Sequence, residues 1–110
     1  MSDIALIFND HIIKAGDMSA NIPAVTKELS NVLGYCVQAV WSGSPVGNIV
    51  IQAGNDNSNW KVISTTAAGG GSGSLLSNND GIHYAYVQVL YNFTSGSGTL
   101  DVTISGKKYT

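Results

Sequence analysis

The feature of this sequence that most restricts its fold is the alternation of apolar and polar side chains with a period of two. Thr99–Ser105 alternates strictly, and His83–Phe93 and Tyr35–Trp41 alternate with a more apolar second face. Successive side chains of a β-strand point to opposite faces, so this period predicts strands with one face in a core. In Thr99–Ser105 the residues expected to point inward are Leu100, Val102 and Ile104. In the other two stretches the alternation groups on one face Tyr35, Val37, Ala39 and Trp41, and likewise Ala85, Val87, Val89, Tyr91 and Phe93.

Turn residues separate these stretches from one another. Ser42–Pro45 follows Tyr35–Trp41. Asn55–Asn59 separates two further predicted strands, Gly47–Gly54 and Trp60–Thr66. Short amides and carboxylates bond to nearby backbone and tolerate left-handed φ, so such runs favour turns. We therefore expect a meander here. Thr94–Gly98 contains two glycines and predicts a hairpin between the last two strands.

Two other segments are interpreted as loops. Ala67–Ser74 is rich in glycine and serine, which is typical of a mobile loop. Because loops of this kind often carry recognition, it is also a candidate contact surface. The composition of Asn78–Gly81 predicts a turn.

The N-terminal third has a weaker pattern. Asp3–Phe8 is expected to form a strand, with His11–Lys14 as its partner across a turn at Asn9-Asp10. Ile22–Leu33 suits either a helical stripe or a strand, and we interpret it as a strand because its neighbours are β. Pro23 excludes that segment from the middle of a central strand.

Together these patterns predict one domain over residues 1–110, an all-β fold of the antiparallel β-sandwich type, similar to a jelly roll. A chain of this length has room for a single core. Residues 1–23 are a candidate N-terminal arm that would add a strand to a neighbouring subunit.

Composition excludes several partners. The chain has five basic residues, all lysine, against seven acidic ones, so phosphate binding and nucleic acid are not expected. Charged residues make up 11% of the sequence, and the abundant hydroxyl and amide groups favour surfaces that pack against other subunits. The sequence shows no secretory signal and no apolar run of about 18 residues, so we expect no membrane partner. The single Cys36 predicts a buried thiol and no internal disulfide.

No motif for chemistry is complete. Gly69–Ser74 lacks the Gly-Lys-Ser/Thr of a P-loop and the last glycine of a dinucleotide fingerprint, so we expect no cofactor. Asp56 and Asp80 are weak candidates for a calcium site, although turn chemistry explains both of their loops. His11 and His83 are interpreted as structural, because no pattern relates them to a serine and a carboxylate. We therefore predict no catalytic residue and no enzyme activity.

The aromatic residues have two interpretations. Trp41 and Trp60 could form a carbohydrate platform with tyrosines, because aromatic faces stack on sugar rings. Packing in the core is the simpler interpretation, since both tryptophans lie at strand boundaries in regular alternation. The tyrosines concerned are Tyr84, Tyr86, Tyr91 and Tyr109.

Several segments resemble a known group of proteins. They are Gln38–Gly43, Gly47–Gln52, Asn55–Trp60, Tyr86–Val89 and Ser95–Lys107. In order and spacing they look like small virion proteins of tailed bacteriophages, over about residues 35–107. The resemblance implies a β-sandwich particle component and no catalytic residues. An arginine often occupies the position of Gln88 in that group, so a salt bridge at that position is not carried over.

The expected function follows from this resemblance. It is that of a non-enzymatic virion structural protein, a capsid decoration or cement protein that bridges major capsid subunits. Its expected partners are the major capsid protein and copies of itself, with a homo-trimer as a candidate assembly. We expect synthesis in the host cytoplasm and a final location on the capsid surface. The alternative is a tail, baseplate or fibre module that binds host-surface carbohydrate. The candidate partner-contact residues are Asn55, Asn57, Asn59, Gly70, Gly71 and Ser72.

Overall fold

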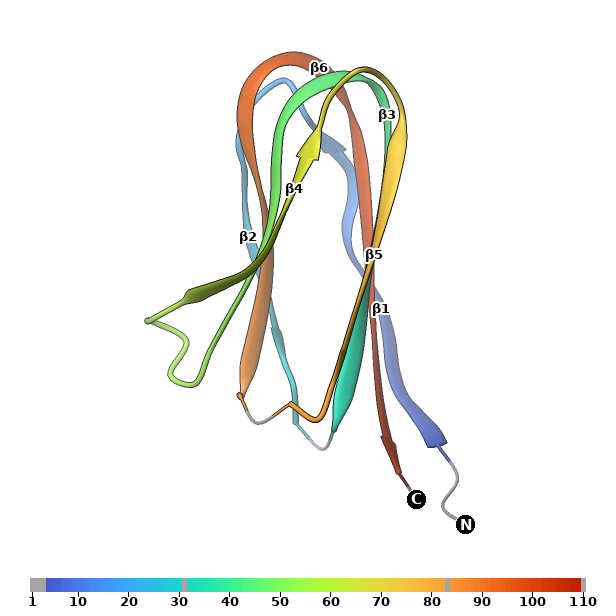
Figure 1. The fold of residues 1–110 in the computed structure, drawn as a ribbon, viewed down its shortest axis with the longest axis vertical. Helices are drawn as coiled ribbons and strands as arrows, with labels where there is room; N and C mark the ends of the chain where they lie inside the picture. The colour runs from blue at the N-terminus through green and yellow to red at the C-terminus, as the bar shows by residue number, and fades with distance from the viewer. Residues whose placement is uncertain (1–3, 31, 83, 110) are drawn as a thin grey trace.

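Six β-strands make up most of the part of the chain that the structure describes (Figure 1). The computed structural model describes residues 4–30, 32–82 and 84–109. Within those ranges, there is no helix of the length and apolarity that crossing a membrane requires. All strand pairings are antiparallel, so the predicted all-β antiparallel class is confirmed. The strands are β1 (Ile4–Asp17), β2 (Ile22–Glu28), β3 (Gly34–Gly54), β4 (Lys61–Ala68), β5 (Gly73–Asp80) and β6 (Tyr86–Tyr109).

The two longest strands, β3 and β6, organise the fold. They have 21 and 24 residues and pair with each other along the whole of β3. Each bends in its middle and so contributes one half to each of two sheets. The first sheet has the order β2, N-terminal half of β6, C-terminal half of β3, β4. The second has the order β1, C-terminal half of β6, N-terminal half of β3, β5.

Arches connect the two sheets at one end of the molecule, the upper end in Figure 1. They are the β1–β2 connection, the bend of β3, the β4–β5 connection and the bend of β6. Two four-stranded antiparallel sheets connected in this way are a jelly roll. The predicted sandwich architecture is therefore confirmed.

Glycines allow β3 and β6 to bend together. Gly43 and Gly96 have positive φ values of 89° and 79°, and a Cβ on Gly96 would overlap the carbonyl oxygen of Ser44. The predicted hairpin at Thr94–Gly98 is wrong, because β6 continues through it. The predicted strand end at Ser42–Pro45 is also wrong, because β3 continues through it, and the first two segments of the predicted meander are therefore halves of one strand. A bend that passes from one sheet to the other needs the same small residues as a hairpin.

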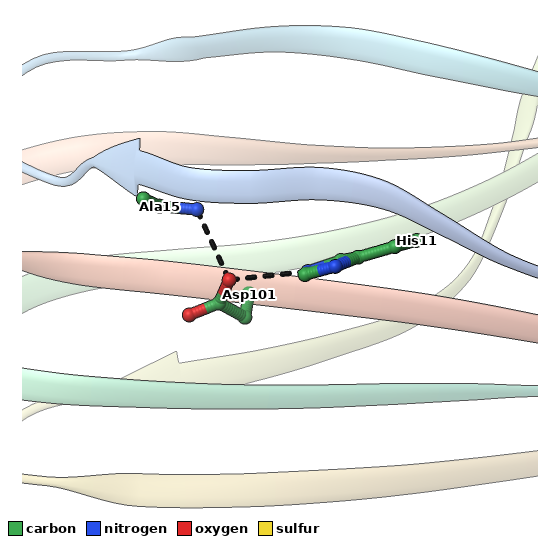
Figure 2. Close-up of polar contacts among 3 residues, drawn as sticks. All are labelled: His11, Ala15 and Asp101. Atoms are coloured by element: carbon green, nitrogen blue, oxygen red, sulfur yellow. Dashed lines mark hydrogen bonds and ion pairs between the residues drawn. The ribbon is translucent and has the colours of Figure 1, made fainter.

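The N-terminal strand β1 is continuous over 14 residues, so the predicted turn at Asn9-Asp10 is wrong. Three register shifts against β6 bend this strand. At the last shift Ala15 has a positive φ of 48°. Its N–H donates to Asp101 Oδ1 at 3.0 Å, and His11 Nε2 lies 3.1 Å from the same oxygen (Figure 2). Asp101 thus provides an acceptor for the Ala15 N–H at the bulge.

Part of the Ile22–Leu33 segment forms strand β2, so its interpretation as a strand is confirmed over Ile22–Glu28. The strand ends five residues before the predicted end. It lies at an edge, as its proline requires. In the single chain, β1 pairs with the chain's own β6. Addition of residues 1–23 as a strand to a neighbouring subunit stays a prediction.

Strand β5 corrects two loop predictions. Asn78–Asp80 belongs to β5 and not to a turn, and Ser74 belongs to β5 and not to the preceding loop. That loop is reduced to Gly69–Ser72. Serine and asparagine favour turns locally, but pairing with β3 along the whole of β5 outweighs that preference.

The core lies between the two sheets. It contains Leu100, Val102 and Ile104, as predicted. It also contains one face of each of the other two alternating stretches, the faces of Tyr35 and of Val87, apart from Ala85, which is partly exposed, and Phe93, which is exposed beside the β6 bend. Tyr91 and Met18 are its largest fully buried side chains. The complete set is Ile13, Met18, Leu29, Val32, Tyr35, Val37, Ala39, Trp41, Ile49, Ile51, Ala68, Ile82, Val87, Val89, Tyr91, Leu100, Val102 and Ile104.

Candidate functional site

The predicted contact residues do not form one surface. Asn55, Asn57 and Asn59 lie in the β3–β4 turn, whereas Gly70, Gly71 and Ser72 lie in the β4–β5 arch. The eight residues of β4 separate the two groups, which places them about 26 Å apart at the usual rise of a strand. Any partner that contacts both groups must therefore extend along β4.

The asparagine turn is explained by its own hydrogen bonds. Asp56 Oδ1 accepts from the N–H groups of Ser58 at 3.0 Å and Asn59 at 2.8 Å, and Asn59 Nδ2 donates to Asp56 Oδ2 at 2.6 Å. These bonds lower the pKa of Asp56 to about 2. Asn55 Oδ1 accepts from the Ala85 N–H at 3.1 Å, which fastens the turn to the segment before β6. The predicted turn is confirmed.

The calcium interpretation gains no geometric support. Asp56 lies in the β3–β4 turn and Asp80 at the end of β5. Among the described residues, no three His, Cys, Asp or Glu side chains come together as a metal site would require. His83 lies outside those residues.

Most aromatic residues serve packing. Trp41 is 7% exposed and lies against Gly73, where a Cβ would overlap the indole ring, and Tyr91 is fully buried. The hydroxyl groups of Tyr35 and Tyr84 lie 2.6 Å apart, and burial raises the pKa of Tyr35. The core interpretation is confirmed for Trp41 and Tyr91. Trp60 is partly exposed, and the Tyr109 side chain lies outside the described part.

The broadest candidate surface is the outside of the second sheet. We define the outer face by eight uncharged residues: Leu6, Asn9, Cys36, Gln38, Val40, Leu76, Thr103 and Ser105. All but Val40 line one open depression of about 340 Å³. Leu76, Leu6 and Val40 are 70%, 57% and 48% exposed. Apolar side chains exposed together among uncharged polar groups are typical of a surface that another molecule covers.

Charged groups also lie on this side of the sheet. Lys107 lines the depression together with the seven uncharged residues and is exposed. Asp101 pairs with Val40 and His11 pairs with Thr103, so both lie beside members of the outer face. His11 Nε2 contacts Asp101 Oδ1, which also accepts from the Ala15 N–H at the β1 bulge (Figure 2). Exposed apolar side chains among polar groups with few charges are typical of a protein–protein interface.

The outside of the first sheet carries a row of hydrogen-bonded side chains across three strands. Gln52 Nε2 donates to Gln88 Oε1, and Gln88 Nε2 donates to Thr26 Oγ1 at 3.0 Å. Gln88 is 8% exposed. Gln88 therefore forms an uncharged bridge between its two neighbouring strands.

Sequence reasoning found one part of the outer face and missed another. Alternation predicted that Thr103 and Ser105 point away from the core, and they do. Leu76 was missed because it lies between the predicted loop Ala67–Ser74 and the predicted turn Asn78–Gly81, in residues that were assigned to no strand. A signal was available, since Leu76, Asn78 and Asp80 alternate with Leu75, Ser77 and Asn79, but it is weak because both sets contain polar residues.

Comparisons with known proteins show similarity of fold. The sequence matches no protein-family model and no curated protein. One similar solved structure comes from Bacillus endospore appendages, described as disulfide-linked pili, at 14% identity and a TM-score of 0.50 over 97% of this chain and 88% of that one. Another comes from infectious bursal disease virus, Gx strain, at 8% identity and a TM-score of 0.52 over 96% of this chain and 32% of that one. At these identities the likeness concerns the β-sandwich alone.

Proposed function

We propose that this protein is a non-enzymatic structural component of a bacteriophage virion, a decoration protein that binds major capsid protein and bridges its subunits. The outer face carries the proposal. Its exposed leucines and valine lie mainly among hydroxyl and amide groups, so a partner that covers them meets few charges, namely Lys107 in the depression and Asp101 beside Val40. The sequence resemblance over residues 35–107 supplies the virion context.

The mechanism is additional buried area at the joints between subunits. A standard interface buries about 1,600 Å² in total. Repetition over a closed shell turns contacts of modest individual affinity into a stable coat through multivalency. No reaction is required, and the partners are the major capsid protein and further copies of this chain, with a homo-trimer still a prediction.

The carbohydrate-binding alternative has lost part of its support. Two of the six aromatic residues considered for a sugar platform, Trp41 and Tyr91, are buried in the core. Trp60 is the tryptophan that remains accessible, and it is only partly exposed. Sugar binding abolished by Trp60→Ala in a folded domain would favour this alternative.

The test uses particles that carry this protein, stripped of it and then incubated with purified chain. Wild-type protein should rebind and restore tolerance to heat, chelator and low salt. Gln38→Lys places a charge in the middle of the outer face and should weaken rebinding at least tenfold. Thr65→Lys, at an exposed position of β4 in the first sheet, is the matched control and should rebind normally.

Two results would overturn the proposal. Stripped particles that are as tolerant as complete ones would exclude a cementing role. Loss of rebinding by Thr65→Lys with normal rebinding by Gln38→Lys would exclude the outer face as the capsid-binding surface.

A further inference from the structure

Four of the described strands lie at sheet edges, and three of these carry features that discourage pairing with another chain. Strand β1 has three register shifts, β2 has one shift together with Pro23, and β4 has one shift and begins at Lys61. Bulges, prolines and lysines at an edge are the usual protections against unwanted strand addition.

Strand β5 lacks these protections. It pairs with β3 through eight consecutive residue pairs from Gly73–Asp80 without a register shift. Its sequence contains no proline and no basic residue, and its one charged residue, Asp80, is its last. Among the described residues β5 pairs with β3 alone, so its other edge presents backbone N–H and C=O groups in a regular row.

We propose that this edge is an interface between two copies of the chain, in which the two β5 strands pair antiparallel about a two-fold axis at Leu76. Directly opposite residues of an antiparallel pair point to the same side of the sheet. A two-fold axis perpendicular to the sheet also keeps the outer sides of both copies together. The axis must therefore pass at a residue of β5 and not between two residues.

The Leu76-centred register gives complementary neighbours. Leu76, the most exposed large apolar side chain described at 70%, lies opposite its own copy and loses much of that exposure. Ser74 lies opposite Asn78, and Leu75 opposite Ser77. The last pair in this register joins Gly73 of one copy to Asn79 of the other. Asp80 lies beyond that pair, so the two Asp80 side chains do not face each other across the axis.

This self-complementarity is the reason for choosing a second copy as the occupant. An isologous contact uses the same patch twice, and a strand that is uncharged over Gly73–Asn79 and has an apolar centre satisfies that requirement. The paired edges join two four-stranded sheets into one of eight strands. The outer faces of both copies then become continuous. The interface is small, at the low end of specific contacts, so dimerisation should depend on concentration.

The first experiment is sedimentation of the purified full chain over a range of concentrations. Wild type should shift from monomer to dimer as its concentration rises. Leu76→Lys should weaken dimerisation at least tenfold, because the introduced lysines of the two copies would lie directly opposite each other at the axis. Leu6→Lys is the matched control, since Leu6 is exposed on β1 at the far edge of the same sheet, and it should dimerise like wild type. Both side chains are largely exposed, so both variants should fold, which circular dichroism checks.

A cysteine pair tests the register itself, in a Cys36→Ser background. Opposite Cα atoms lie about 4.5 to 5.5 Å apart, within the range of a disulfide. Leu76→Cys should therefore cross-link two copies on oxidation. Ser74→Cys points to the same side but should not, because its copy lies four residues further along, about 13 Å away.

Three outcomes would overturn the inference. They are a wild type that stays monomeric at the highest concentration, Leu76→Lys that dimerises like wild type, and cross-linking of Ser74→Cys in preference to Leu76→Cys. If wild type stays monomeric and an extended peptide binds along β5, the edge belongs to a different partner. The inference does not depend on the proposed function, because it is measured on free protein and capsid rebinding is measured with Gln38→Lys.

Discussion

The two open sides of the sandwich are closed in different ways. On one side, β1 and β2 come into contact, and Phe8 packs on Gly106. Lys27 Nζ lies 2.5 Å from Asp10 Oδ2 and 4.4 Å from the centre of the Phe8 ring, so it connects the two sheets. Met18 is fully buried in the arch above. We call this the closed side.

On the other side, which we call the open side, β4 and β5 face each other across the sandwich. Their inward positions are polar and partly exposed, with Ser64 and Thr66 on β4 and Ser77 and Asn79 on β5. Only Ala68 and Leu75, near the arch, extend the apolar core to these strands.

The difference separates stability from association. Apolar burial stabilises the closed side, whereas backbone pairing with β3 holds β4 and β5 in place. A strand held by its backbone, with a hydroxyl-rich inner side and a regular outer edge, is suited to accept another strand. The following predictions test this comparison, from the largest expected effect to the smallest.

Met18→Ala should destabilise the protein by roughly 2 to 5 kcal/mol, because it removes a fully buried side chain from the closed side. Urea unfolding measures the change. Leu75→Ala on the open side is the control, and since Leu75 is only partly buried it should cost less than half as much. Equal losses would contradict the comparison.

Gly106→Ala should cost about 1 to 3 kcal/mol, because the added Cβ would overlap the Phe8 ring. Gly69→Ala adds the same methyl group at the start of the β4–β5 arch, where no atom lies within 4 Å, and it should leave stability within about 0.5 kcal/mol of wild type. Thermal unfolding of the pair is sufficient. A Gly106→Ala variant as stable as Gly69→Ala would show that the closed side is not tightly packed.

Lys27→Met should cost less than about 1 kcal/mol at low salt, because the side chains of Lys27 and Asp10 are 27% and 45% exposed and solvent screens the pair. The difference from wild type should shrink as salt is added. Lys14→Met, at an exposed position of β1, should have no measurable effect. A salt-independent loss would mean that packing on Phe8, and not charge, is the main contribution of Lys27.

The β3–β4 turn should respond to acid. The folded pKa of Asp56 is about 2, below its ordinary 3.8, so its stabilising contribution is present above about pH 4 and is lost as the pH falls through about 2. The drop in Tm between pH 5 and pH 2 should therefore be smaller for Asp56→Asn than for wild type. Identical drops in Tm for the two proteins would show that Asp56 does not contribute to the loss of stability in acid.

Alternation in the sequence was sufficient to predict the sandwich and the inward residues of its central strands, because burial of one face imposes a period of two. It could not distinguish a hairpin from a bend between sheets, since Thr94–Gly98 suits both. Nor could it identify β5, where Leu75 and Leu76 are adjacent and serines and asparagines occupy both faces. The outer face depends on which strands become neighbours, and pairing between residues distant in sequence determines that.

The most direct test of the account is amide hydrogen exchange of Gly73–Asp80 and Lys61–Ala68 at low and high protein concentration. In each edge strand alternate amides face away from β3 and exchange readily in a monomer. If β5 is the association edge of the open side, its outward amides become protected as concentration rises, while those of β4 do not change. Exchange in β5 that is independent of concentration, or protection that arises in β4 instead, would contradict the account.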